Sequence, residues 1–385
     1  MDEFEIKAKK VEYGNMKGGW ESKLDLDIIF LSGAEMDFPT APVIREKLVE
    51  FAQNGLYGFT IQDERYNHSI IEWMKKVRNL TIKEEDIIPT LGTIFGLNTA
   101  IRAFSEIGDE IIIQSPSYYR FDRAVLNNAR KIIYNPMIEE KNQYRIDFKD
   151  LEEKMASPKA KMMILCLPHN PTGKVFKVEE LEKIKELSLK YNVIIYSDEI
   201  FGEIQFKTNI SYGNITDQLC VISTSLGKAF NFTGVNHANV LIRDPILKKK
   251  YLQQRKIDHF GSIDPFFYNA LLAAYSKEGS IWIEKMKQYV YAQYLYLVEE
   301  LKDTPIEISK LEGGFVIWMN FKNIPVPDLE KWLLEKVKVV GDMGEEYGNY
   351  PTYVRFNIAT SHQNIITLAQ RLKAEIKNQG SFLDF

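Results

Sequence analysis

Short apolar runs rich in β-branched residues alternate with helical patterns through the middle of this chain, and this alternation limits the possible folds most strongly. The strand candidates are Ile87–Leu91, Glu110–Gln114, Lys131–Tyr134, Met162–Leu167, Val193–Ser197, Leu219–Ser223 and Ala238–Ile242. Two intervening segments, 94–104 and 178–191, repeat apolar residues with the period of one helix face. Near-continuous apolar strands separated by helices indicate a mostly parallel sheet covered on both faces. We therefore expect an α/β fold with seven such strands, in which ligands bind beyond the carboxyl ends of the strands.

The pattern changes from about Ser276 onwards. A long helical stretch at 282–302 is followed by strand candidates at 306–309, 314–320 and 353–358 and by helical patterns at 328–337 and 365–376. This succession is typical of a smaller α+β domain. At ~100–200 residues per domain, a chain of 385 residues is consistent with two domains. We predict a large domain at 48–278 and a small domain formed by 1–47 together with 279–385.

Charge and composition argue against several classes of protein. The net charge is −4 and the basic residues are spread along the chain, which disfavours nucleic acid as a partner because phosphate binding needs a basic face. The N-terminal MDEFEIKAKK lacks the apolar core of a signal peptide, and no apolar run approaches the ~20 residues of a membrane span. Cys166 and Cys220 lie in apolar runs, as buried thiols of a reducing compartment do. We expect a cytoplasmic protein that binds neither nucleic acid, membrane nor metal.

Two charged residues follow strand candidates. Asp198 ends the run at 193–198, where its carboxylate can pair with a protonated ring nitrogen of a ligand or can cap the next helix. Lys228 follows small residues that let a ligand approach the backbone, and Ser225 can donate to a phosphate. A P-loop is not formed, because the first glycine and the final hydroxyl residue of that motif are both missing around the lysine. Taken alone, Lys228 would be interpreted as an ordinary surface lysine.

Three further segments could bind a ligand. Gly92-Thr93-Ile94 lies between a strand candidate and a helical pattern, where free N–H groups suit a phosphate, although an ordinary turn is the commoner case. Asn170 lies in the turn Pro168-His-Asn-Pro-Thr-Gly173, which would hold its amide rigidly. Arg355 is a lone charge in an apolar strand candidate. A buried arginine needs an anionic partner, which is either a protein carboxylate or the carboxylate of a substrate.

The order of these motifs carries more information than any one of them. Along the chain stand Gly92-Thr93, Pro116-Ser-Tyr118, Asn170-Pro-Thr-Gly173, Ser197-Asp-Glu199, Ser225-x-x-Lys228 and Arg355. In this order they resemble the fold-type I enzymes of the aminotransferase class I/II family, which depend on pyridoxal 5'-phosphate (PLP). The resemblance runs from about residue 33 to residue 376. It implies the PLP-dependent transferase fold, PLP as cofactor, an amino acid as substrate and a homodimer with shared active sites.

The resemblance also implies a role for each motif residue. Lys228 would form the covalent bond to the cofactor and move the proton at Cα, while Asp198 would pair with the pyridine nitrogen. Asn170 would bond the ring hydroxyl, and Tyr118 would stack on the ring. The remaining cofactor-binding residues would be Gly92, Thr93, Ile94, Ser225 and, reaching into the neighbouring subunit's phosphate site, Tyr57. The substrate-binding residues would be Gly33, Ala34, Asn170 and, on the α-carboxylate, Arg355.

Within this family the chain is most similar to the C–S β-lyase (cystathionine β-lyase) branch. The similar segments are Ala34-Glu-Met-Asp-Phe38, Tyr57-Gly-Phe59, Pro168-His-Asn-Pro171 and Lys228-Ala-Phe-Asn-Phe-Thr-Gly234. This similarity implies α,β-elimination to a thiol, ammonia and pyruvate. The chain departs from the pattern at Phe201, where tyrosine or histidine is usual, at Gly227, where serine or threonine is usual, and at Glu35, where aspartate is usual. Transamination therefore stays open as the alternative, and a regulatory binding protein on the same scaffold is a third interpretation.

Overall fold

The computed structural model describes residues 3–5, 14–25, 27–207 and 210–380. Its central sheet has seven strands in the order β2-β10-β9-β8-β7-β3-β4. Their bounds are β2 Ile87–Thr90, β3 Glu110–Ser115, β4 Lys131–Pro136, β7 Ala160–Cys166, β8 Ile194–Asp198, β9 Cys220–Thr224 and β10 Ala238–Leu241. Neighbouring strands from β9 to β4 run parallel, whereas β10 is antiparallel to both of its neighbours. The predicted α/β fold with a mostly parallel sheet is thus confirmed.

Helices cover both faces of this sheet, because its strands are apolar on both sides. In β3, Ile111 and Ile113 join one buried cluster, and Ile112, which points the opposite way, joins the other. The first cluster includes side chains of α4 (Thr93–Phe104), α5 (Tyr119–Asn127) and α9 (Pro245–Ile257). The second includes side chains of α6 (Phe148–Met155) and α7 (Val178–Tyr191). Two buried faces explain why these strands read as continuous apolar runs rather than as alternating ones.

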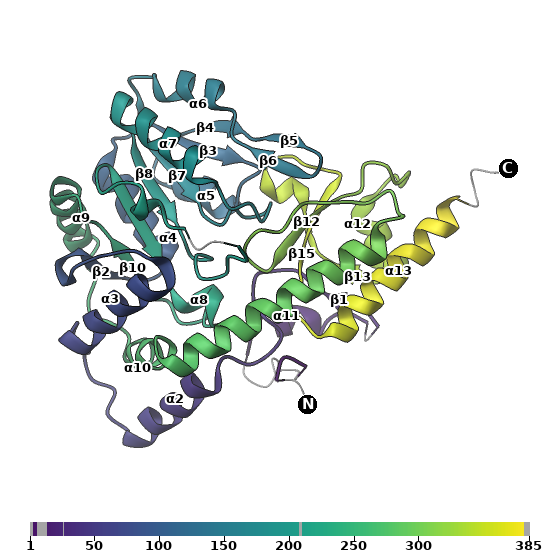
Figure 1. Cartoon of the computed structure of the whole chain (residues 1–385), viewed down its shortest axis with the longest axis horizontal. Coiled ribbons are helices and arrows are strands. Elements are labelled where there is room, and N and C mark those ends of the chain that lie inside the picture. Colours follow the sequence, from purple (N-terminus) through teal and green to yellow (C-terminus); the bar gives the residue numbers. More distant parts are fainter. Residues whose placement is uncertain (1–2, 6–13, 26, 208–209, 381–385) are drawn as a thin grey trace.

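A second, smaller sheet follows in the C-terminal third of the chain. It is antiparallel, has the order β11-β12-β15-β14, and consists of β11 Glu307–Ile308, β12 Val316–Asn320, β14 Asp342–Met343 and β15 Tyr353–Asn357. Beside it, β1 (Ile29–Phe30) pairs in parallel with β13 (Val339–Val340). In Figure 1 the long helix α11 (Lys277–Leu301) extends from α10 (Pro265–Ala274), below the central sheet, towards α13 (His362–Gly380) and this second sheet.

The other elements connect these layers. They are α1 Met16–Glu21, α2 Pro42–Asn54, α3 Glu64–Arg78, α8 Leu226–Ala229, α12 Leu329–Trp332, the hairpin of β5 Ile138–Glu140 and β6 Gln143–Arg145, the 3-10 turns Glu84–Asp86, Tyr212–Asn214 and Gly344–Tyr347, and the π-helical turn Leu333–Val337. The helix expected at 328–337 is therefore α12 continued by the π-helical turn. The domain boundaries at residues 47 and 278 stay predictions, and most of the segment MDEFEIKAKK, in which we expect no signal peptide, lies outside the described residues.

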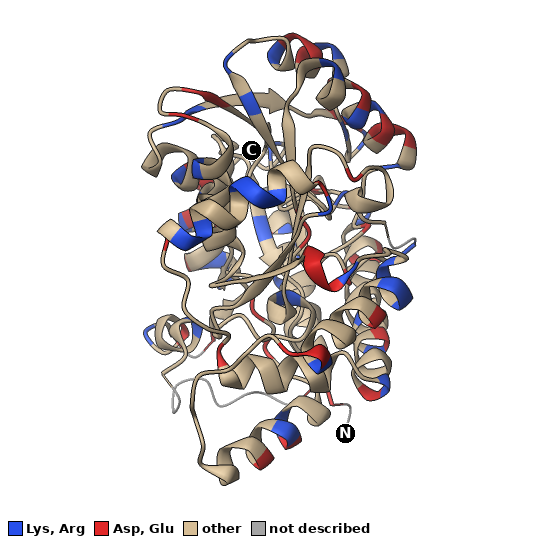
Figure 2. Cartoon of the chain, turned by 90° about the vertical axis from the view of Figure 1, so that its left-hand side faces the viewer, with Lys and Arg blue, Asp and Glu red and all other residues tan. Residues whose placement is uncertain are grey.

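Charged residues of both signs lie on the outer helices. Figure 2 shows blue and red stretches alternating along these helices, while the strands inside are mostly tan. Among the helices that the structure describes, none combines the length and the apolar character that crossing a membrane requires.

Candidate active site

A cavity of about 1070 Å³ lies at the carboxyl ends of the central strands, next to the second sheet. Every residue that sequence analysis selected for the site lines it except Tyr57: Gly33, Ala34, Gly92, Thr93, Ile94, Tyr118, Asn170, Asp198, Ser225, Lys228 and Arg355. The strand-end positions explain this convergence, since the carboxyl ends of parallel strands meet at one edge of a sheet. The residues come from segments more than 300 positions apart in the chain.

Asp198 is the last residue of β8 and is only 4% exposed. Its Oδ1 accepts a hydrogen bond from the N–H of Ile200 at 3.1 Å. The pKa of this carboxyl group is raised to about 7, chiefly by burial and to a lesser extent by Glu199, against the opposing effects of the Ile200 N–H and of Lys228. No described lysine or arginine forms an ion pair with this carboxylate, so it is suited to pair with a protonated ring nitrogen.

Lys228 lies on the short helix α8, whose N-terminus is capped by Ser225. Its Nζ donates to the carbonyl oxygen of Ala34 at 2.7 Å. The pKa of this amine is lowered to about 8, chiefly by burial and next by the nearby charge of Arg355. A substantial neutral fraction therefore exists near pH 8, and only the neutral amine can attack an aldehyde or accept a proton.

The turn before α4 has the features of a phosphate site. Gly92 has φ 102°, a conformation that favours glycine, and a side chain added there would meet no atom within 4 Å. No described side chain caps the N-terminus of α4, whose first residues Thr93 and Ile94 line the cavity, so its first N–H groups are available to an anion bound there. The hydroxyl of Ser225 is already engaged, because it donates to the carbonyl oxygen of His237 at 2.9 Å and accepts from the N–H of Gly227. Its predicted phosphate contact would require this hydroxyl to turn.

Asn170 and Arg355 contact each other in the cavity. Arg355 Nη1 donates to Asn170 Oδ1 at 2.9 Å, which turns the amide nitrogen of Asn170 away from the guanidinium. No described residue accepts from that nitrogen, so it is available to a ligand oxygen. His169, the neighbour of Asn170 in the same turn, contacts Thr172 through Nδ1 at 2.9 Å. Burial lowers the pKa of His169 to about 3, so this imidazole is a neutral structural group.

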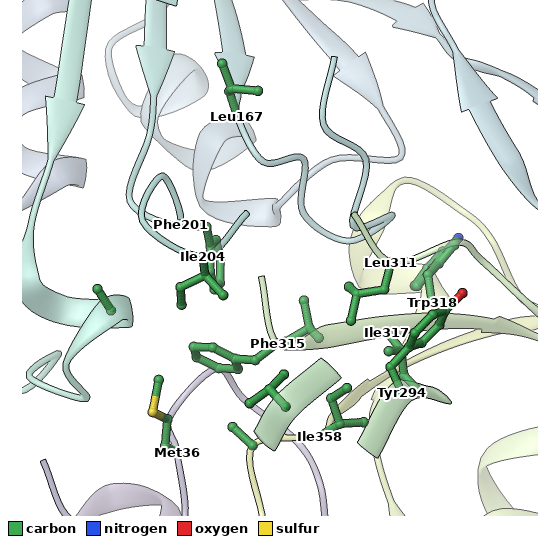
Figure 3. Packing of buried hydrophobic residues seen from close by; sticks show 14 of the residues in the cluster. Met36, Leu167, Phe201, Ile204, Tyr294, Leu311, Phe315, Ile317, Trp318 and Ile358 are labelled. Carbon is green, nitrogen blue, oxygen red and sulfur yellow. The ribbon is translucent and has the colours of Figure 1, made fainter. Parts of the chain in front are cut away.

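Tyr118 and Phe201 supply aromatic walls. Tyr118 precedes α5, and burial raises the pKa of its hydroxyl to about 12. Phe201 contacts Phe315 edge-to-face with ring centroids 5.3 Å apart. Figure 3 shows Phe201 and Ile204 above Phe315, with Met36 below and to the left, so the loop that carries Phe201 packs against the start of the second sheet. At position 201 the cavity therefore has an apolar ring where the family usually has a polar group.

Tyr57 lies away from this cavity. Its hydroxyl donates to the carbonyl oxygen of Ala52 at 2.7 Å, and its ring stacks on Phe266 at 5.6 Å. It belongs to an exposed apolar segment, in which Phe59 is 98% exposed. Within one chain, then, Tyr57 has no access to the predicted phosphate position.

Sequence analysis assigned no role to three residues that shape the cavity. Asn231 accepts from the N–H of Met36 and donates to the carbonyl oxygens of Met36 and Phe38. Asn357 donates to the carbonyl oxygen of Glu35 at 2.6 Å. Together they fix the loop at 33–38 over Lys228. Asp342 accepts from Arg355 Nε at 2.9 Å and from Nη2 at 2.5 Å.

These residues fit PLP. The cavity offers an amine, a carboxylate, an amide donor, an aromatic wall and an uncapped helix N-terminus, which are the groups that this cofactor's aldehyde, pyridine nitrogen, ring oxygen, ring face and phosphate require. The fold and this set of donors define a PLP-dependent enzyme of fold type I.

Comparison with known proteins agrees with this class. The pattern of the family "Aminotransferase class I and II" matches residues 26–372. Cystathionine beta-lyase PatB of Bacillus subtilis is 30% identical over 355 residues, which cover 89% of this chain and 91% of PatB. An aspartate aminotransferase of Pyrococcus horikoshii is 27% identical, covering 93% of both chains. The crystal structure of cystalysin from Treponema denticola, which contains PLP, superposes with a TM-score of 0.93 at 26% identity and covers 98% of this chain and 99% of cystalysin.

The chain belongs to the aminotransferase class I and II family. It is a PLP-dependent enzyme that acts on amino acids, and its relatives are C–S lyases together with aminotransferases.

Proposed function

We propose that this protein is a C–S β-lyase. The net reaction takes an L-cysteine S-conjugate and water to a thiol, ammonia and pyruvate. Lys228, an amine of lowered pKa that lines the cavity with Asp198 and the loop at 33–38, is the base that this reaction needs. The observation that carries elimination is the 30% identity to a cystathionine β-lyase over 89% of the chain.

Each residue has a defined task in this proposal. PLP, when bound, withdraws electrons from the substrate's Cα so that its C–H bond can break. Lys228 Nζ holds the cofactor at rest and takes the proton from Cα. Asp198 keeps a proton on the pyridine nitrogen, and the amide nitrogen of Asn170 donates to the ring oxygen. Phe201 adds no hydroxyl there, so Asn170 is the donor on which this oxygen depends.

The test is release of pyruvate and thiol from L-cystathionine by the PLP-loaded protein with no 2-oxo acid present. We expect equimolar pyruvate and thiol, and a loss of at least about a thousandfold in the Lys228→Ala variant, since general-base and covalent roles are both removed. A protein that binds PLP yet releases neither product would contradict the lyase assignment.

Transamination is the second candidate, because an aspartate aminotransferase is similar over nearly the whole chain. It uses the same lysine but needs a 2-oxo acid as second substrate. Adding 2-oxoglutarate and measuring glutamate separates the two reactions. Glutamate formation without thiol release would assign the protein to the aminotransferases.

We also propose a homodimer with shared active sites, located in the cytoplasm. The exposed aromatic segment around Tyr57 supports the dimer, and the two buried free thiols, Cys166 and Cys220, agree with a reducing compartment. Mixing Tyr57→Phe subunits with Lys228→Ala subunits tests sharing, since one site of each hybrid then has both residues intact. Activity above that of either parent is expected, and none would count against shared sites.

A further inference from the structure

Arg355, the residue proposed to bind the substrate's α-carboxylate, already holds a carboxylate of its own chain. Its Nε and Nη2 both donate to Oδ2 of Asp342, at 2.9 and 2.5 Å. The side chains of Arg355 and Asp342 are 4% and 11% exposed, so water screens this pair little. With the bond from Nη1 to Asn170, three of the five guanidinium N–H bonds are used.

Asp342 also accepts hydrogen bonds from the loop that follows β1, which contains the predicted substrate contact Gly33. The N–H of Gly33, a predicted substrate contact, donates to both carboxylate oxygens of Asp342 at 3.1 Å. The hydroxyl of Ser32 donates to Oδ1 at 2.5 Å. Donors from β15 and from the loop after β1 thus converge on one carboxylate, as they would on a bound anion.

The positive charge of Arg355 is therefore neutralised by the negative charge of Asp342. An α-carboxylate that approaches the two remaining N–H bonds of Arg355 meets a cation whose charge Asp342 already balances. The two carboxylates would then repel each other in a partly desolvated cavity. Glu346 lines the same cavity and adds no attraction for an anion.

We propose that Asp342 is a specificity-determining residue that occupies the carboxylate-binding donors of Arg355 and Gly33. A free α-carboxylate then contributes little to binding. The site accepts amino substrates whose carboxyl group is a neutral amide, ester or peptide bond about as well as those with a free carboxylate. This inference rests on the proposed function and on the predicted place of Arg355 at the carboxyl end of the substrate.

The probes are L-alanine and L-alaninamide, which share the amine and Cα but differ in carboxyl charge. Each is titrated into the PLP-loaded protein, and the dissociation constant is read from the cofactor's visible absorbance. For the wild type we expect the two constants to agree within about threefold. In Asp342→Asn, which keeps an acceptor oxygen but loses the charge, L-alanine should bind at least about tenfold tighter while L-alaninamide changes little, because Arg355 then lacks its counter-ion.

Two controls isolate the effect. Glu345→Gln removes one exposed charge from the same segment outside the cavity and should leave both constants unchanged. Asp342→Ser, which also keeps an oxygen acceptor, replaces Asp342→Asn if that variant does not fold, and should show the same preference for L-alanine.

A cofactor-independent measurement separates this inference from the proposed function. Acetate added to the PLP-free protein should raise the Tm of Asp342→Asn but not of the wild type. This result would support the inference even if L-cystathionine were not cleaved. The inference is overturned if wild-type protein prefers L-alanine to L-alaninamide by tenfold or more, or if neither Asp342 variant gains affinity for L-alanine or for acetate.

Discussion

Lys228 and Asp198 line the same cavity, and burial shifts their pKa values in opposite directions, to about 8 for the amine and about 7 for the carboxyl group. Each shift means that the folded protein disfavours the charged form of that residue. Without cofactor these groups therefore cost stability, and a ligand that pairs with them recovers it. Ionisable groups whose pKa values are shifted in this way are common at functional sites.

The variant Asp198→Asn tests this cost. The pKa of Asp198 in the folded protein lies above its unfolded value of 3.8. The loss of folding stability caused by ionised Asp198 is therefore absent well below pH 4, grows as pH rises, and is complete above pH 7. In urea unfolding of the PLP-free protein, the variant should be more stable than wild type at pH 8 by on the order of 1–3 kcal/mol. At pH 5 the advantage should be clearly smaller. An equal difference at both pH values would show that ionisation of Asp198 is not the cause.

Individual site residues were predictable where they follow a strand. Asp198 ends an apolar run, Asn170 and Lys228 follow one within four residues, and these positions place them at the ligand edge of the sheet. Asp342 was not predictable, because it belongs to a two-residue strand whose pairing with Arg355 is a tertiary contact. A carboxylate close in sequence to a buried arginine was the available signal, and sequence analysis had left open a protein carboxylate as the partner of Arg355.

At the scale of elements, the loop at 33–38 forms one wall of the cavity and depends on Asn231. This asparagine makes three hydrogen bonds to the loop and has φ 51°. Asn231→Ala should lower the free energy of unfolding by about 1–3 kcal/mol, since three bonds of ordinary strength are lost. It should also speed hydrogen exchange at the amide of Met36, measured by mass spectrometry.

The matched control is Asn349→Ala. Asn349 has φ 70°, is exposed, and makes no side-chain hydrogen bond within the described structure. It therefore reports the cost of alanine in a left-handed conformation alone. If both variants lost the same stability and left Met36 exchange unchanged, the proposed anchoring of the loop would be wrong.

Helices with a regular spacing of apolar residues were predicted well, whereas the direction of the strands could not be predicted. The helix at 178–191 matches its prediction at both ends, because Leu181, Ile184 and Leu187 mark one buried face. Helix α11 begins five residues before the predicted 282, where Ser276 caps it by accepting from Gly279 N–H. The antiparallel direction of β10 leaves no trace in its apolar run, since that run would look the same in either direction.

At the scale of the whole molecule, the site lies between two sheets that are distant in sequence. The pairing of β1 with β13 joins residues about 310 positions apart, and composition gives no sign of such contacts. The residue pattern predicted only that a second α+β region exists. The resemblance to a family predicted the fold in which this region lies beside the first.

The proposed dimer makes a prediction at this scale. Phe59 is 98% exposed, so Phe59→Asp should not unfold the subunit but should dissociate a dimer that buries this ring. Size-exclusion chromatography with light scattering should show a monomer of about 45 kDa, close to the 44.7 kDa of the chain. Ile107→Asp, at another exposed apolar position (78%), should leave the dimer intact. A Phe59→Asp variant that stays dimeric would place the interface elsewhere.

The central claim is that Lys228 carries PLP in this cavity. Borohydride reduction of the PLP-loaded protein fixes the cofactor to the amine that holds it, and peptide mass mapping then identifies the residue. We predict a single pyridoxyl modification on the peptide that contains Lys228, and none in Lys228→Ala. Modification of a different lysine, or an equal yield of labelled protein from Lys228→Ala, would contradict the account.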